Sequence, residues 1–132
     1  MKFKSFVTNK QKELEGVWVQ VPGSDLELKV ARMTNPHYET FLRKVCAPFR
    51  SLIQQNKMPT ERMNALMMQA VSHHVLLDWK NLEADDGTQI PYSQAKALEL
   101  MSQSNDFFKL VIDFANDADL YRDEESEALK GN

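Results

Sequence analysis

The sequence is poor in residues that build covalent crosslinks, phosphate-binding loops and membrane spans. Its 132 residues include four glycines and one cysteine, Cys46. A lone cysteine cannot form an internal disulfide, and its apolar helical surroundings indicate a buried, inert thiol in a reducing compartment. No apolar run approaches the roughly 20 residues that cross a bilayer, and the basic N-terminus lacks the apolar stretch of a secretory signal. We therefore expect a cytoplasmic protein without a membrane partner.

Motifs of catalysis and metal binding are also missing. The sequence has no glycine-rich phosphate loop and no G-x-S-x-G nucleophile motif. His73 and His74 are adjacent, so on a helix they point about 100° apart and cannot bind one metal ion together. Carboxylate pairs fall in acidic runs, where solvated charge is the default explanation. We expect no catalytic residues, no cofactor and no metal, and hence not an enzyme.

The net charge of −3 conceals an asymmetry between the two halves of the chain. Residues 1–62 carry eleven Lys/Arg and six Asp/Glu (+5), whereas residues 63–132 carry five and thirteen (−8). One interpretation is a solvated acidic face on the last helix. The other is that the basic half of one copy contacts the acidic half of the next. Nucleic acid is not an expected partner, because the positive charges form no dense stripe with interleaved aromatics.

Two hydrophobic periods divide the chain. From Gly16 to Met33 apolar residues alternate with polar ones around "PGSD", which predicts a β-hairpin with a four-residue connection, and residues 2–8 are a candidate further strand. Beyond Met33 the period is helical. Asn35, followed by Pro36, is expected to cap the first helix, and Pro48 is expected to divide it. Thr60 is expected to cap a helix that reaches about Trp79, and Ser93 a short helix. Ser104 or Asn105 is expected to cap a last helix, whose apolar face extends to Tyr121.

These elements predict a mainly α fold, a compact bundle of four or five helices with a small N-terminal β-hairpin or sheet. We expect a single domain over residues 1–132. It comprises a β element (1–33), a helical core (34–122) and a charged tail (123–132).

The loop after Trp79 contains "ADDGTQIPYS", which raises the question of calcium binding. An EF-hand loop needs glycine at its sixth position; with Gly87 there, Asp86 is the one residue at a ligand position that could serve. A structural role fits better, because Gly87 permits a turn and Pro91 forces Ile90 to be extended. Tyr92 then precedes the Ser93 cap and is placed to form a hydrophobic staple. The predicted structural loop residues are Trp79, Asp86, Gly87, Ile90, Pro91, Tyr92 and Ser93.

Several apolar side chains look surplus to one small core. Buried aromatics commonly anchor protein interfaces, and methionine lines adaptable grooves as well as cores. Trp79, at the entrance of the loop, is one of these surplus side chains in the first interpretation. In the second interpretation, Trp79 and Tyr92 simply close the core over the loop. The candidate partner-binding residues, for client or self contacts, are Trp18, Met68, Phe107 and Phe108.

The runs "VLLDWKNLEADDGTQIPYSQAKALELM" and "FFKLVIDFANDADLYRDEESEALKGN" resemble the C-terminal region of tail assembly chaperones of long-tailed bacteriophages. The shared pattern is a D-W pair, a D-G turn, an I-P-Y-S helix entry and an acidic end. Upstream, "LKVARMTNPHYETFLRKVCAPF" is similar to the family's strand followed by an N-P-x-Y helix start.

The resemblance implies a protein of the infected host's cytoplasm that is absent from the mature virion. It would bind the tape measure protein, keep it soluble and help recruit the tail tube protein, mainly through a longer frameshifted form, with self-association. This chain would be the shorter product. The alternative is a small helical DNA-binding regulator that uses residues 93–121 as a helix-turn-helix, which the acidity of that region disfavours.

Overall fold

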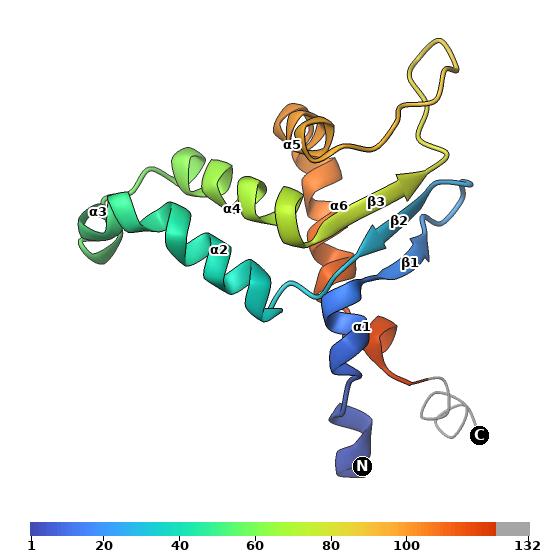
Figure 1. The fold of residues 1–132 in the computed structure, drawn as a ribbon, viewed down its shortest axis with the longest axis horizontal. Helices are drawn as coiled ribbons and strands as arrows, with labels where there is room; N and C mark the ends of the chain where they lie inside the picture. Colours follow the sequence, from blue (N-terminus) through green and yellow to red (C-terminus); the bar gives the residue numbers. More distant parts are fainter. Residues whose placement is uncertain (124–132) are drawn as a thin grey trace.

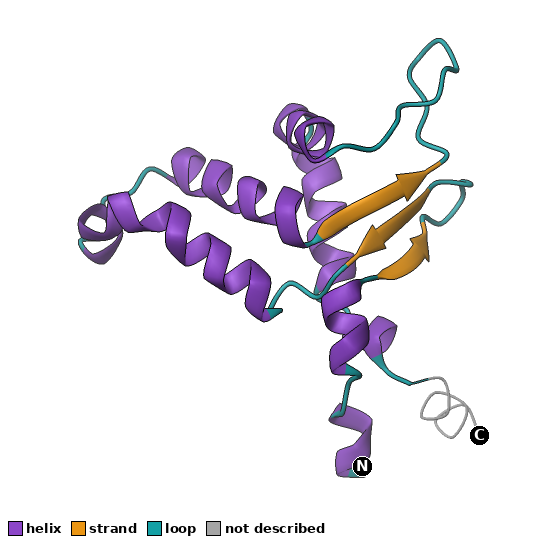
Figure 2. Ribbon diagram, in the orientation of Figure 1, coloured by secondary structure: helices purple, strands orange, loops and turns teal. Residues whose placement is uncertain are grey.

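The computed structural model describes residues 1–123, which contain six α-helices and a three-stranded sheet (Figures 1 and 2). The strands are β1 (Val17–Gln20), β2 (Glu27–Val30) and β3 (Leu76–Lys80). The helices are α1 (Lys10–Glu15), α2 (Pro36–Cys46), α3 (Arg50–Gln54), α4 (Thr60–His74), α5 (Gln94–Gln103) and α6 (Asn105–Ala115). Three short 3-10 helices are η1 (Phe3–Phe6), η2 (Ala47–Phe49) and η3 (Ala118–Tyr121). The predicted fold class is confirmed in its coarser form, a helix-rich chain with a small antiparallel β element.

The predicted hairpin forms the first two strands of the sheet. Val19 lies opposite Leu28 in the antiparallel register. The N–H of Val21 donates to the carbonyl of Leu26 at 2.8 Å, which closes the four-residue connection between them. Within it Gly23 takes φ 79°, a left-handed conformation that glycine adopts without a steric penalty. Turn chemistry that is readable in the sequence therefore sets the hairpin.

The third strand corrects the prediction of a helix that reaches Trp79. α4 ends at His74, and β3 pairs antiparallel with β2, placing Trp79 opposite Leu28. Val75 and the two leucines after it form a short apolar run, and such runs fit a buried helix or a buried strand equally well. The outcome is decided by tertiary structure, because the second edge of β2 is satisfied by pairing with β3.

Two short helices occupy the N-terminus, so the further strand predicted for residues 2–8 is wrong. After η1, the side-chain oxygen of Asn9 accepts hydrogen bonds from the N–H groups of Gln11 (2.9 Å) and Lys12 (3.1 Å) and caps α1. Gly16 ends α1 with φ 87°, and a β-carbon there would lie 3.0 Å from the side chain of Leu77. A glycine is therefore required where the chain turns from α1 into β1.

α2 and α4 lie side by side and extend away from the sheet (Figure 1). Asn35 caps α2 as predicted, since its side-chain oxygen accepts a hydrogen bond from the N–H of Tyr38 at 3.0 Å. The amide nitrogen of the same side chain donates to the carbonyl of His74 at 3.1 Å, which ties the start of α2 to the end of α4. Pro48 falls in η2, between α2 and α3, and divides the helix as predicted.

Serine caps begin the last two α-helices. Ser93 accepts a hydrogen bond from the N–H of Lys96 at 3.0 Å, and Ser104 accepts one from the N–H of Phe107 at 3.1 Å. α6 ends at Ala115, so the prediction that the last helix continues to Tyr121 is wrong. Residues 118–121 form η3 instead. The predicted charged tail lies outside the described residues except for Asp123.

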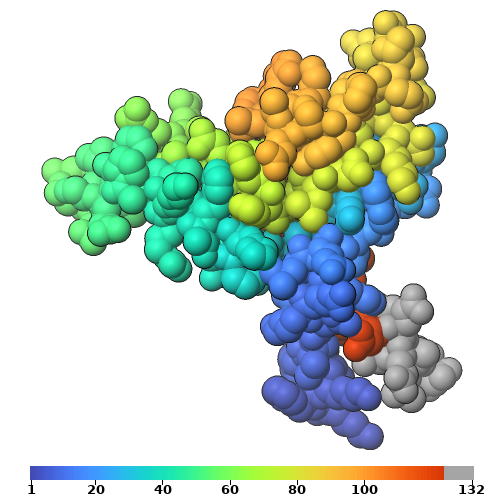
Figure 3. Space-filling model, in the orientation of Figure 1, coloured from blue at the N-terminus to red at the C-terminus, as the bar shows by residue number. Residues whose placement is uncertain are grey.

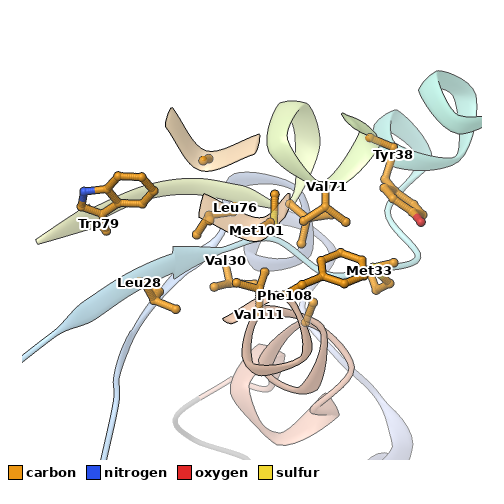
Figure 4. Packing of buried hydrophobic residues seen from close by; sticks show 14 residues of the cluster. Leu28, Val30, Met33, Tyr38, Val71, Leu76, Trp79, Met101, Phe108 and Val111 are labelled. Carbon is orange, nitrogen blue, oxygen red and sulfur yellow. The ribbon is translucent and has the colours of Figure 1, made fainter. Parts of the chain in front are cut away.

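The core lies on one face of the sheet (Figure 4). α6 packs against β2 on the face that carries Leu28 and Val30. The cluster of buried apolar side chains consists of Leu28, Val30, Met33, Tyr38, Ala70, Val71, Val75, Leu76, Trp79, Ala97, Met101, Phe108, Val111 and Ala115. The helices supply most of this cluster, but they pack against a sheet as well as against one another, so the predicted bundle holds only in outline.

Candidate interaction site

The loop between β3 and α5 is anchored to the sheet by two aromatic side chains. Trp79 is 5% exposed, and its indole N–H donates to the carbonyl of Ile90 at 2.7 Å. The ring of Tyr92 meets the indole edge to face, with centroids 4.9 Å apart, and its hydroxyl donates to the carbonyl of Leu76 at 2.7 Å. Burial, with a contribution from Asp78, raises the pKa of Tyr92 to about 12, so this donor keeps its proton at neutral pH. Both rings close the core beneath the loop, the second of the two interpretations.

The remaining loop residues make contacts within the loop. The carboxylate of Asp86 accepts hydrogen bonds from the hydroxyl (2.7 Å) and N–H (3.0 Å) of Thr88, and these bonds lower the pKa of Asp86. Gly87 takes φ 87° in open space, and the N–H of Ile90 donates to the carbonyl of Leu82 at 2.7 Å. Within residues 1–123, no group of three or more His, Cys, Asp or Glu side chains is arranged to hold a metal ion. The loop geometry is thus explained without a ligand.

Trp18 lies on the face of the sheet opposite the core. It is paired with Lys29 in the register and is 38% exposed. The ammonium of Lys80 lies 4.0 Å from the centroid of its ring, a cation–π contact from β3 across the sheet. Trp18 therefore presents an aromatic surface flanked by positive charge.

The other three candidate partner-binding residues lie on the helical side of the molecule. Met68 is half-buried on α4, and the hydroxyl of Ser102 lies 3.9 Å from its sulfur. Phe107 is half-buried at the start of α6, whereas Phe108 is 6% exposed and belongs to the core. Adjacent helical residues point about 100° apart, so only one of the two phenylalanines faces the interior fully. The structure thus places Trp18 apart from the others and leaves Phe108 little surface for a partner.

Two highly exposed aromatic side chains lie in residues 2–8, for which the sequence predicts a strand. Phe3 is 80% and Phe6 63% exposed, with ring centroids 6.3 Å apart. Within residues 1–123, six of the seven exposed large apolar side chains fall in the first eighteen residues: Met1, Phe3, Phe6, Val7, Leu14 and Trp18. The signal that could have found this helical turn is the i, i+3, i+4 spacing of Phe3, Phe6 and Val7.

The three histidines of the chain meet where α2 packs against α4. The ring centroid of His74 lies 6.0 Å from that of His37 and 6.2 Å from that of His73. Phe41 stacks on His73 with centroids 4.4 Å apart. Burial is the main cause that lowers the pKa of His74, and the charges of His37 and His73 lower it further.

Acidification through the histidine range is therefore expected to destabilise the contact between α2 and α4. The folded chain holds the pKa of His74 below its unfolded value, so the unfolded state binds more protons as the pH falls. The contribution of His74 to stability is complete above about pH 6.5, the pKa of histidine in the unfolded chain. This contribution decreases as the pH drops below that value. Urea unfolding followed by circular dichroism should show a lower midpoint at about pH 5.5 than at about pH 7.5. A His74→Gln variant should show a smaller difference, and an equal difference would exclude His74 as the cause.

The fold and the site define a small helix-rich domain with an antiparallel sheet, an anchored loop and an exposed apolar N-terminus. The chain belongs to the YdaY prophage protein family, whose model matches residues 33–132. It is therefore a phage-associated protein, and residues 1–32, which hold η1, α1, β1 and β2, lie outside the matched range. No similar chain was found among curated proteins or among solved structures. None of the helices within residues 1–123 has the length and apolar content to span a membrane.

Proposed function

We propose that this prophage protein is a tail assembly chaperone that binds the tape measure protein, keeps it soluble and helps recruit tail tube subunits. It acts in the host cytoplasm, without catalysis, and is not part of the mature virion. Membership of a prophage protein family supports a role in phage biology. The resemblance of the loop and the last helices to tail assembly chaperones supports the particular role.

The observation that supports the proposal most strongly is an exposed apolar surface whose side chains are not part of the core. Six large apolar side chains are exposed in the first eighteen residues, while the core cluster is filled by other residues. Burying apolar surface against a partner contributes about 25 cal/mol per Å². A chaperone for an apolar helical client uses this term to compete with aggregation of the client.

Trp18 and Met68 are the client contacts that this proposal names. Trp18 offers an exposed aromatic ring, and Met68 offers a flexible half-buried thioether that adapts to different client side chains. A DNA-binding role has no comparable support, because residues 106–119 carry four aspartates and one lysine, which phosphates would repel.

Co-expression with apolar helical fragments of the prophage's tape measure protein tests the proposal. We expect the chain to co-purify with such fragments and to raise their soluble fraction. Trp18→Ser should weaken binding by about tenfold, the effect of a moderate interface hot spot. The matched control is Leu52→Ser, because Leu52 on α3 is also 38% exposed.

Two outcomes would overturn the proposal. One is that the tape measure fragments stay insoluble and unbound in the presence of the wild-type chain. The other is salt-dependent binding to duplex DNA with an affinity that exceeds any affinity for the fragments, which would favour the DNA-binding regulator.

A further inference from the structure

The N-terminal arm (residues 1–8) projects from the body of the molecule (Figures 1 and 3). Its apolar side chains include Phe3 and Phe6 at 80% and 63% exposure. The first twelve residues carry four lysines and no acidic residue. At the base of the arm, the N–H of Asn9 donates to the carbonyl of Tyr121 at 2.6 Å. The arm is thus a basic, apolar projection with a fixed base.

α6 carries a surface of complementary character. Phe107, Leu110 and Phe114, at i, i+3 and i+7, lie on one side of the helix, next to the buried face formed by the residues that follow each of them. We call these three half-buried residues the α6 strip. The exposed Asp106 and Asp113 flank it. The α6 strip therefore combines partly exposed aromatic surface with negative charge.

We propose that the chain self-associates head to tail, with the N-terminal arm of one copy docked on the α6 strip of the next copy. The arm and the α6 strip are complementary in two properties that drive association, because both carry apolar surface and they carry opposite charges. Phe3 and Phe6 gain apolar contacts with the strip, and Lys2 and Lys4 lie against Asp106 and Asp113. This inference does not depend on the proposed function. It assigns Phe3, Phe6 and Phe107 to a self contact and leaves Trp18 and Met68 as the proposed client contacts.

Other occupants of the arm fit less well. Residues 124–132 of the same chain are acidic, but their sequence offers one large apolar side chain, Leu129, against the two phenylalanines of the arm. A symmetric contact between two arms would place lysines against lysines. A second copy supplies both the aromatic surface and the opposite charge.

A head-to-tail contact has a consequence for assembly size. Each added copy leaves one arm and one α6 strip unoccupied, so the assembly continues to grow or closes into a ring. Its charged component weakens with salt, because the screening length falls from about 10 Å at 0.1 M to about 3 Å at 1 M. Sedimentation velocity on the wild-type chain should show species larger than a dimer at low salt and smaller species near 1 M salt.

Paired variants test the contact directly. The arm variant is Phe3→Ser with Phe6→Ser, and the strip variant is Asp106→Lys with Asp113→Lys. Both pairs replace exposed side chains, which leaves the core intact. Each variant alone should raise the dissociation constant for self-association by about tenfold or more. An equimolar mixture should form a two-chain species, because the arm variant keeps its strip and the strip variant keeps its arm.

Charge exchange within one chain provides a second test. Adding Lys2→Glu and Lys4→Glu to the strip variant should restore assembly, since the charges are opposite again. Leu52→Ser with Lys57→Glu, exposed positions away from both surfaces, is the control and should assemble like the wild type.

The inference is overturned if the wild-type chain is monomeric at all concentrations and salt levels. It is also overturned if the strip variant assembles like the wild type, which would indicate a contact between arms. Because no tape measure fragment is present in these experiments, their failure would leave the chaperone proposal standing.

Discussion

Replacing Tyr121 with alanine is expected to lower the free energy of unfolding by about 3–5 kcal/mol, the usual effect of deleting a large buried aromatic side chain. Tyr121 is fully buried, and its hydroxyl donates to the carbonyl of Val30 on the central strand at 3.0 Å. The guanidinium of Arg32 lies 5.5 Å from the centroid of its ring. Since small domains are stable by only about 5–15 kcal/mol, the variant should unfold at a much lower urea concentration.

Tyr121→Phe provides the matched control, because it removes the hydroxyl and keeps the ring. We expect a loss of about 1–2 kcal/mol, since the carbonyl of Val30 loses its buried partner. Burial raises the pKa of Tyr121, so the hydroxyl is a proton donor throughout the accessible pH range. If the alanine variant loses less than about 1 kcal/mol, η3 does not hold the C-terminal end of the domain against the sheet.

Most features set by local chemistry were predictable from the sequence. The cap predicted at Thr60 is wrong, because Thr60 is the first residue of α4 and no side chain caps that helix. Asn35, Ser93 and Ser104 each cap the helix that follows, because a short polar side chain satisfies otherwise unpaired N–H groups. The hairpin connection around Gly23 is equally local. In each case the interacting groups lie within a few residues of one another, so spacing alone identifies them.

Features set by tertiary contacts were not predictable. β3 and the end of α4 share an apolar run, and only the free edge of β2 decides that residues 76–80 form a strand. Residues 2–8 have a strand-like composition, but within residues 1–123 no sheet edge pairs with them. The helical face expected to reach Tyr121 stops at Ala115, although Tyr121 is buried as its apolar character requires. Burial was easier to predict than the conformation that achieves it.

The residues of the candidate site also fall into these two groups, those set by local chemistry and those set by tertiary contacts. The sequence indicated the turn at Gly87 and the cap at Ser93. It did not indicate the hydrogen bonds that Asp86 accepts from Thr88 or the one that Tyr92 donates to Leu76. The hydrophobic staple of Tyr92 stays a prediction. The exposure of Phe3 and Phe6 depends on where the body of the molecule lies, and spacing cannot show that. The separate environments of Phe107 and Phe108 follow from the orientation of α6 on the sheet.

Replacing Trp79 with alanine is expected to cost about 3–5 kcal/mol and to release the loop of residues 81–93. The side chain fills the core at the end of β3, and its indole N–H holds the carbonyl of Ile90 at 2.7 Å. Urea unfolding measures the loss of stability, and limited proteolysis in native conditions measures the release. Cleavage within the loop should accelerate by more than global unfolding alone explains, because the anchor of the loop is lost while the rest of the sheet remains paired.

A double-mutant cycle separates anchoring from core filling. Trp79→Phe keeps an aromatic ring in the core but removes the hydrogen bond to Ile90, and Tyr92→Phe removes the hydrogen bond to Leu76. Each change should cost about 1–2 kcal/mol. Because the two hydrogen bonds hold the same loop to the sheet, the double variant should depart from additivity by at least about 0.5 kcal/mol. Strict additivity, with unchanged proteolysis of the loop in both single variants, would show that the two aromatic residues do not fasten the loop as a unit.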